Sequence, residues 1–258
     1  MSLSRRDVLK LGGAAMLASA LSPTLDALAS SAPPSVFSRG SATLPRVALT
    51  IDDCYLSYIL EKMENALAEY PEMRVTFFPT GEALLSTEGK LPGVWKRLAE
   101  RGHDIGYHSF YHDNLQVFSN ENALLDYDMW LGALKKVLGK EPRVHFARPP
   151  FGNVSPTFLT LCKQRGLVCT MWSWGWGGIE VEDTVKYTVP KTKNGDIVLL
   201  HTRSVDMGVI LEGLPWLKQQ GLQAVTLRQL YYDFRKEQIN AAGCDASTAS
   251  SLTRTCNE

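Results

Sequence analysis

The sequence predicts an α/β fold built on parallel strands. Short apolar runs alternate with segments of helical periodicity between residues 46 and 236, and this alternation is typical of parallel α/β architectures. Several helical segments end at a glycine in the C-cap position. No shift in composition divides this stretch, so we expect one domain. Periodicity alone does not distinguish an open sheet from a barrel.

The expected elements follow in chain order. The apolar runs predict seven strands, at residues 47–51, 74–78, 104–107, 144–147, 167–172, 197–200 and 223–227. The helical periods predict helices at residues 56–69, 93–101, 121–138, 156–165, 182–189, 207–220 and 228–236. The glycines expected to end helices are Gly102, Gly139, Gly166 and Gly221.

The overall composition excludes several protein classes. Of 258 residues, 45% are hydrophobic, which is ordinary globular usage and excludes a disordered chain, a collagen or a coiled coil. Lys+Arg and Asp+Glu both number 27, so the net charge is zero. A general nucleic-acid binder is usually basic, so we expect no nucleic-acid partner.

The N-terminus has the features of an export signal. Charged residues around Arg5 and Arg6 precede an apolar stretch and small-residue cleavage sites, in the order of a signal peptide. The paired arginines resemble the twin-arginine signal, which predicts the twin-arginine export machinery as a partner. We expect a signal peptide over 1–29, a linker over 30–45, a catalytic domain over 46–236 and a polar tail over 237–258. The mature chain is then periplasmic or extracellular, without a stable membrane anchor.

The chain has five cysteines, an odd number, so at least one is free or pairs with another chain. Export permits disulfides. Cys244 and Cys256 are placed to close the tail, and Cys162 and Cys169 flank the turn at Gly166. Cys54 is then left over, beside the most polar part of the chain.

Four groups of polar residues follow predicted strands, where the active sites of α/β proteins lie. They are the pair Asp52 and Asp53, the pair His108 and His112, the run from Arg148 to Gly152, and His201. Each group alone has an ordinary structural explanation. Together they predict one site, because a parallel barrel brings the carboxyl ends of its strands to one face. Two histidines spaced four apart can share a metal on one helical face.

Two histidines and one aspartate form a three-ligand zinc site with an open fourth position, as a catalytic zinc requires. The other aspartate then supplies a general base and His201 a general acid. Metal-assisted hydrolysis is the chemistry that this set of residues predicts.

These motifs, in this order, resemble the polysaccharide deacetylases of carbohydrate esterase family 4. The similarity rests on Thr50-Ile51-Asp52-Asp53, His108 to His112, Arg148-Pro149-Pro150-Phe151-Gly152 and Leu199-Leu200-His201, and covers about residues 46–230. It implies a distorted (β/α) barrel with about seven parallel strands, in agreement with the strand count above.

The resemblance also implies a role for each residue. Asp53, His108 and His112 would hold a divalent metal, most often Zn²⁺. Asp52 would be the base and Arg148 would keep it ionised and oriented. The Phe151 backbone N–H would help to stabilise the oxyanion, His201 would protonate the leaving amine, and Leu199 would line the acetyl pocket. Trp174 is a candidate for stacking on a sugar ring, with core packing as the alternative.

The chain departs from the family pattern at two places. Cys54 replaces a glycine, which the loop tolerates if the backbone angles there are ordinary. The window 172–178 lacks the acidic residue that would pair with His201, so Glu180, Glu182 and Asp183 become the candidates.

The function expected from these features is removal of N-acetyl groups from sugar residues of an envelope glycan. Two alternatives remain open: hydrolysis of a small non-sugar amide or formyl group on the same scaffold, and a carbohydrate-binding relative with weakened catalysis.

Overall fold

The computed structural model describes residues 36–241. Of these, residues 36–233 belong to one compact unit, and residues 234–241 are assigned to a second. The expected signal peptide, Cys244, Cys256 and the tail from residue 242 lie outside the described residues.

All strand pairings within the named sheets are parallel, as expected. Five strands pair in the order β3-β2-β1-β7-β6, β8 pairs with the start of β1, and β4 pairs with β5. Their bounds are β1 Arg46–Asp53, β2 Thr76–Pro79, β3 Asp104–Ile105, β4 Phe146–Ala147, β5 Val168–Cys169, β6 Trp174–Gly175, β7 Ile197–His201 and β8 Gln223–Ala224. The seven expected strands are confirmed, and β6 is an eighth.

Single-residue bridges connect the β4-β5 pair to the larger sheet. Tyr107, just after β3, forms a parallel bridge with Ala147. On the other side, Phe37 forms a parallel bridge with Thr170 after β5, and Arg39 forms an antiparallel bridge with Asp196 just before β7. The strands therefore curve into a distorted barrel whose gap beside β5 is filled by an N-terminal segment, which confirms the predicted fold class.

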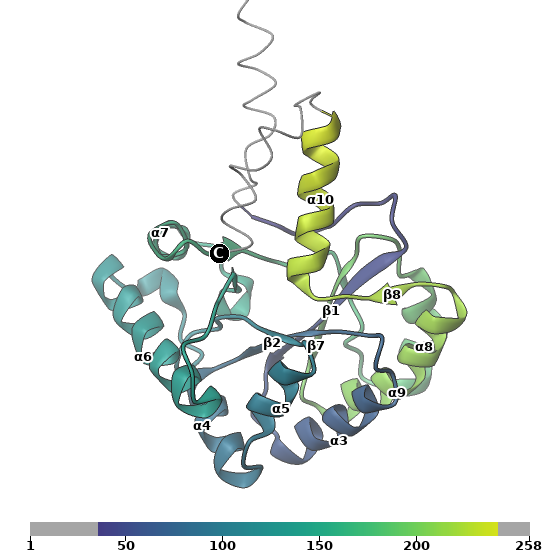
Figure 1. Cartoon of the computed structure of the whole chain (residues 1–258), viewed down its shortest axis with the longest axis horizontal. Coiled ribbons are helices and arrows are strands. Elements are labelled where there is room, and N and C mark those ends of the chain that lie inside the picture. Colours follow the sequence, from purple (N-terminus) through teal and green to yellow (C-terminus); the bar gives the residue numbers. More distant parts are fainter. Residues whose placement is uncertain (1–35, 242–258) are drawn as a thin grey trace, which may run out of the picture. The chain divides into compact units, whose positions relative to one another are not determined.

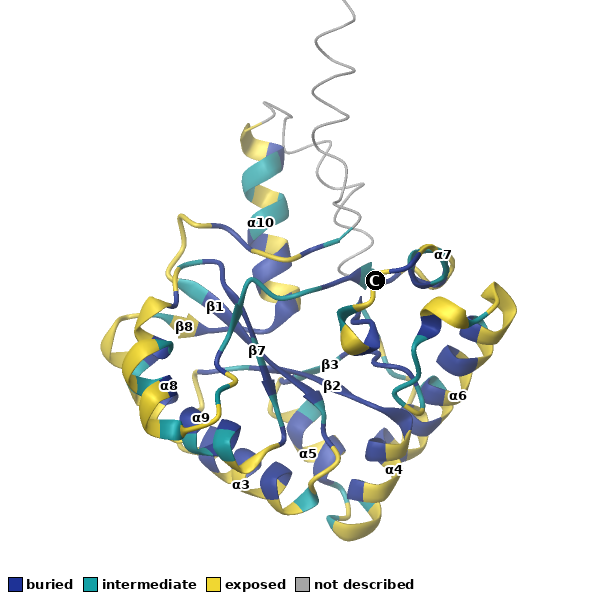
Figure 2. Ribbon diagram, turned by 180° about the vertical axis from the view of Figure 1, so that it is seen from behind, coloured by how far each residue is buried: buried dark blue, intermediate teal, exposed yellow. Residues whose placement is uncertain are grey.

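Helices surround this barrel. Figure 1 shows α3, α4, α5, α6 and α9 outside β1, β2 and β7, and Figure 2 shows buried strands at the centre with exposed outer faces on the helices. The helices are α3 Ser57–Ala68, α4 Gly81–Lys90, α5 Val94–Glu100, α6 Asn120–Leu138, α7 Pro156–Arg165, α8 Val181–Tyr187, α9 Ser204–Gln219 and α10 Leu227–Ala241. Short 3₁₀ segments lie at Leu115–Val117 (η1), Pro150–Gly152 (η2) and Val189–Lys191 (η3).

Local sequence explains where several of the helices begin and end. Ser119 caps α6 by accepting a hydrogen bond from Asn122 N, and Ser155 caps α7 in the same way. The four glycines expected as helix ends all have positive φ, between 66° and 87°. Helix α4 was not expected; its N-cap is Thr80, whose side chain accepts a hydrogen bond from Ala83 N.

The second half of the predicted linker is part of the fold. Phe37 is 1% exposed, and its backbone N–H donates to the Cys169 carbonyl. Gly40 N donates to the Gly195 carbonyl. The reason is tertiary: this segment supplies the hydrogen bonds that β5 lacks on its open side. Toward the C-terminus, helix α10 extends past residue 236, where the catalytic domain was expected to end.

Within residues 36–241, no helix is long and apolar enough to cross a membrane.

Candidate active site

The site lies where β1 and β7 end side by side. Asp52 pairs with His201 in the parallel register, and Thr50 pairs with Leu199. Because alternate side chains of a strand share a face, these four residues point to the same side of the sheet. The predicted base and the predicted acid are thus neighbours across one strand pair.

Asp53, His108 and His112 form a compact triad at this edge. The Nε2 atoms of His108 and His112 lie 3.4 Å and 3.2 Å from Asp53 Oδ1, and the three ligand atoms are all within 4.8 Å of one another. Tetrahedral zinc ligands at about 2.0–2.2 Å from the metal stand about 3.3–3.5 Å apart. The separations from Asp53 Oδ1 therefore fit a shared divalent metal.

The hydrogen bonding around the triad agrees with that fit. His108 Nδ1 is 2.8 Å from the Arg148 carbonyl oxygen, so Nδ1 carries the proton and Nε2 is left for a metal. Asp53 Oδ1 is buried and has no hydrogen-bond donor among the described residues. A carboxylate oxygen can lie this close to two imidazole nitrogens only when protons or a cation lie between them.

The charges of the triad are strongly coupled. Burial raises the pKa of Asp53, but the close His108 and His112 rings, as positively charged neighbours, outweigh burial and hold that pKa far below its usual range. Burial lowers the pKa of His108, but the Asp52 and Asp53 carboxylates raise it by more. A cation shared by these groups would replace the protons.

The segment that carries both histidines is a loop, which corrects the expectation of a helical face. Asp126, buried on α6, accepts hydrogen bonds from Phe110 N at 3.0 and 3.1 Å. Backbone amides at the start of α4 donate to the carbonyls of Ser109 and Phe110. These contacts hold a tight turn, which brings His112 back to Asp53 without helical spacing.

Backbone strain is concentrated at the site. Within residues 36–241, five non-glycine residues have positive φ, between 58° and 64°: Asp53, Cys54, Ser109, His112 and Phe151. Such conformations cost about 1–3 kcal/mol each and persist where the surrounding structure enforces them, typically at functional sites. Two of these residues are metal-ligand candidates.

Arg148 anchors the predicted base. Its side chain is fully buried, and Nη1 donates to Asp52 Oδ1 and to Thr50 Oγ1, both at 2.7 Å. The guanidinium also lies over the rings of Phe78 and Trp172, at 4.5 and 5.7 Å from their centroids. Asp52 is thereby oriented, with Oδ2 4.0 Å from His108 Nε2.

Phe151 presents a free backbone donor beside the triad. Its ring is 65% exposed and lies 4.5 Å from the His112 ring, centroid to centroid. The positive φ of Phe151 turns the backbone sharply within η2. Its N–H donates to no acceptor in the described part of the chain, as an oxyanion donor requires.

The predicted sugar-binding tryptophan is not brought together with these residues. Trp174 pairs with Val198, which lies on the opposite face from Leu199, and its indole N–H donates to the Thr188 carbonyl. Gly175 pairs with Leu199 instead, and a Cβ atom at Gly175 would have no atom within 4 Å. Strand β6 therefore leaves open space beside Leu199 and places no aromatic ring there.

Two neighbours of the site were missed by sequence reasoning. Trp172 lies near the Arg148 guanidinium and against Gly152; it stands two residues before Trp174 in the sequence, but its orientation depends on the loop before β6. Asp206, on the first turn of α9, has Oδ2 3.9 Å from His201 Nδ1. Its only sequence signal was its position five residues after His201.

Cys54 differs from expectation, because its backbone is not ordinary. Its φ is 63°, a left-handed conformation that favours glycine. The thiol is buried with Sγ 3.5 Å from the Ile51 carbonyl. Burial, with the Asp53 and Asp52 charges, raises the pKa of the Cys54 thiol well above its usual value. The sulfur is therefore a protonated core group.

The chain is similar to known proteins in sequence. Residues 39–170 match the family model described as polysaccharide deacetylase. A peptidoglycan-N-acetylglucosamine deacetylase of Bacillus cereus is 30% identical over 204 residues, which cover 71% of this chain and 87% of the relative.

Solved structures share the fold. A peptidoglycan deacetylase from Bacillus subtilis has a TM-score of 0.66 at 23% identity, covering 76% of this chain and 94% of the other. A family 4 pseudoenzyme from Bacillus anthracis has a TM-score of 0.69 at 20% identity, covering 78% and 70%. With a family match that takes in the triad, Asp52 and Arg148, and a 30% identical relative covered over most of its length, the chain belongs to the polysaccharide deacetylase family.

Proposed function

We propose that this protein is a metal-dependent hydrolase that removes N-acetyl groups from sugar residues of an envelope glycan, with peptidoglycan as the substrate class. The observation that carries the proposal is the meeting of Asp53, His108 and His112 with a buried Asp52 beside His201. The Bacillus cereus relative named as a peptidoglycan-N-acetylglucosamine deacetylase supports the choice of glycan.

The base side of the mechanism follows from Asp52. A divalent metal held by the triad, which we expect to be Zn²⁺, would polarise the acetyl carbonyl and make an attacking water more acidic. Asp52 takes the proton of that water, and Arg148 keeps its carboxylate aimed at the triad through the 2.7 Å hydrogen bond.

The acid side uses different residues. The Phe151 N–H donates to the oxygen on which negative charge develops. When the carbon–nitrogen bond breaks, the electron pair stays on nitrogen and His201 supplies a proton, so that the sugar leaves as an amine. Leu199, partly exposed on the same face as His201, contacts the acetyl methyl group.

The rim of the site favours a sugar polymer over a small amide. Exposed aromatic side chains follow several of the strand ends, including Tyr55, Tyr58, Tyr111 and Phe151, which are 37–65% exposed. Aromatic rings combine a large apolar face with low conformational entropy, which suits broad contact with a saccharide. A small amide would need a closed pocket and no such rim.

The site's completeness argues against a binding-only relative. The similar pseudoenzyme shares 20% identity, which supports the fold alone. This chain has a complete set of candidate metal ligands, an oriented carboxylate, and a histidine on the adjacent strand.

The test is acetate release from a panel of acetylated glycans and small amides, with and without chelator. We expect release from acetylated glucosamine or muramic acid polymers, loss of release with chelator, and recovery with zinc. Release from small amides but from no glycan would favour the other hydrolase. Glycan binding without acetate release, even with added metal, would favour the binding relative.

Filling the space at Gly175 should block the acetyl subsite. We expect Gly175→Leu to lower kcat/KM by about 10–200-fold, the range by which pocket contacts discriminate, with little change in melting temperature because a Cβ atom there meets no atom within 4 Å. Gly132→Leu, at an equally open glycine on α6, is the matched control and should leave activity intact. Equal activity of both variants would remove Gly175 from the subsite.

We also propose that the chain is exported by the twin-arginine machinery to the periplasm, cell envelope or outside of the cell, and that residues 1–29 are removed. Replacing Arg5 and Arg6 together by lysine keeps the charge but should retain the unprocessed precursor in the cytoplasm. Lys10→Arg, a neighbouring conservative change, should export normally. Cell fractionation with immunoblotting measures both, and normal export of the double variant contradicts the assignment.

A further inference from the structure

The imidazole of His201 has a buried carboxylate beside it. Asp206 is fully buried on the first turn of α9, and its Oδ2 lies 3.9 Å from His201 Nδ1. That nitrogen is itself buried and has no hydrogen-bond partner in the described part of the chain. We infer that Asp206 is the positioning residue for His201: it accepts the Nδ1–H and leaves Nε2 as the nitrogen that delivers the proton. This inference rests on the proposed hydrolysis.

The position of Asp206 is fixed by three donors. Its Oδ2 accepts from His201 N at 3.0 Å and from Arg203 Nε at 2.7 Å, and its Oδ1 accepts from Arg203 Nη2 at 2.8 Å. Because one donor is the backbone of His201 itself, the carboxylate keeps a constant place relative to that residue. The Arg203 guanidinium balances its charge, as Arg148 balances that of Asp52.

Closing the gap to His201 requires a shift of about 1 Å to reach hydrogen-bond distance. Leaving a buried nitrogen without a partner is destabilising, which favours a rotation of the imidazole that brings Nδ1 to Asp206. An Nδ1–H directed at a carboxylate selects the tautomer and orientation of a histidine in catalysis. In the reaction, the Nε2 proton passes to the amine and Asp206 exchanges no proton.

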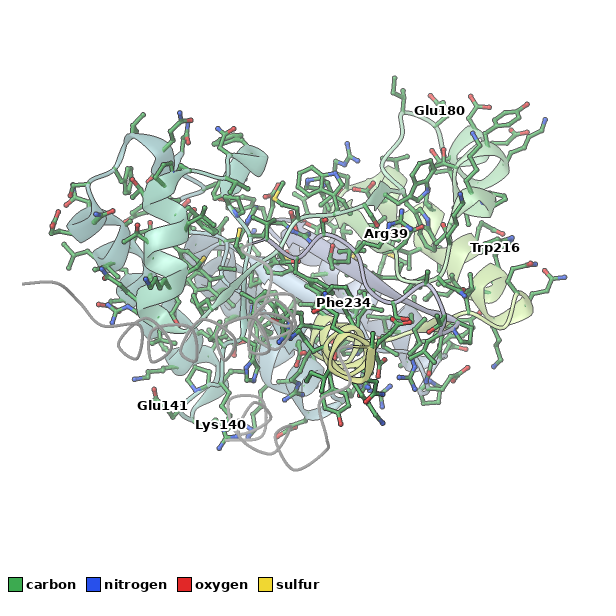
Figure 3. The ribbon with its side chains drawn as sticks, turned by 90° about the horizontal axis from the view of Figure 1, so that it is seen from above. Arg39, Lys140, Glu141, Glu180, Trp216 and Phe234 are labelled. Atoms are coloured by element: carbon green, nitrogen blue, oxygen red, sulfur yellow. The ribbon has the colours of Figure 1, made fainter. Side chains whose placement is uncertain are left out.

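The acidic residues that the sequence suggested as partners of His201 do not lie beside it. Glu180, Glu182 and Asp183, which the sequence suggested, are all exposed. Figure 3 shows Glu180 at the outer edge of the view, and this residue is the N-cap of α8. Among the described residues, Asp206 is the carboxylate within 4.0 Å of the His201 ring nitrogens.

The test compares two substrates. An acetylated glycan loses an amine that needs a proton, whereas 4-nitrophenyl acetate loses an anion that needs none. We expect Asp206→Asn to lower acetate release from the glycan by at least about 10-fold while hydrolysis of the ester changes by less than 3-fold and metal content stays the same. A purely structural role would lower both rates together.

The matched control is Asp196→Asn, at the other end of β7. Asp196 is also buried and accepts from Ser173 Oγ, Lys193 N and Arg39. Its loss should affect stability and give no difference between the two substrates. If Asp196→Asn also lowered hydrolysis of the glycan much more than hydrolysis of the ester, the inference would be overturned.

A double-mutant cycle tests the route through His201. Adding Asp206→Asn to His201→Ala should cause less than a 3-fold further loss on the glycan, because residues that act as a unit are not additive. A full additional loss would show that Asp206 acts elsewhere and would overturn the inference.

A measurement on the unmodified protein covers the case in which Asp206→Asn does not fold. Nitrogen NMR of the histidine rings, with His201 assigned through His201→Ala, should find the proton on Nδ1. A proton held on Nε2 in the neutral ring would overturn the inference. This result does not depend on turnover, so it separates failure of the Asp206 role from failure of the deacetylase function, which wild-type acetate release decides.

Discussion

Replacing His108 with alanine should remove bound metal and deacetylase activity together. His108 supplies one of three ligands whose atoms converge within 4.8 Å, and its Nδ1 is already committed to the Arg148 carbonyl. A two-ligand remnant binds metal poorly, and the metal contributes several kcal/mol to stabilising the transition state, or about 10³-fold in rate. Metal per chain by atomic emission and acetate release by a coupled assay measure the two losses.

The matched control is His103→Ala. His103 and His108 flank β3 at its two ends, and His103 is buried, with Nδ1 accepting a hydrogen bond from Val75 N. Burial, together with Arg74 and Arg101, lowers the pKa of His103 to about 4, so it is a neutral structural group. Its loss should lower the melting temperature and leave metal content at the wild-type level. Full activity of a metal-stripped His108→Ala protein would refute the metal site.

Replacing Asp52 with asparagine should keep the metal and lower turnover by about 10²–10⁴-fold, the usual value of a general base. The amide is nearly the same shape and can still accept from Arg148, but it cannot take a proton from water. Because Asp52 and Arg148 are a buried pair with a 2.7 Å contact, a loss of stability is also expected. Melting temperature and metal content must therefore be measured with the rate.

Asp53→Asn is the variant to compare with Asp52→Asn, because the Asp52 and Asp53 carboxylates are adjacent in sequence but contact different residues. Asp53 faces His108 and His112, whereas Asp52 faces Arg148. We expect Asp53→Asn to lose metal first and activity as a result. If Asp52→Asn lost metal as readily as Asp53→Asn, Asp52 would be a ligand and the base would have to be found elsewhere.

The fold was largely predictable because its signals are local. Strands such as 47–51 and 197–200 are continuous apolar runs, and each predicted C-cap glycine adopts the positive φ that its role requires. The miss at β6 has a physical cause: a two-residue strand in a run of glycines and tryptophans has no period that can be measured. The sequence predicts a linker around Phe37 because the backbone hydrogen bonds that hold this segment in the fold join it to distant residues, Cys169 and Gly195 among them.

Part of the site was likewise predictable from the sequence, and part depended on the tertiary structure. Sequence alone determined the residue types of the triad, the aspartate pair and the arginine, because each follows a strand and parallel strands end at one face. Tertiary structure alone decided which side chains meet: β6 pairing turns Gly175 inward and Trp174 outward, and a strained turn, in place of a helix, joins His108 to His112. It also placed Asp206 beside His201, since that contact depends on how α9 leaves the end of β7. The spacing of motifs gives their order along the chain. Contacts such as these depend on strand register and side-chain packing, which no short stretch of sequence determines.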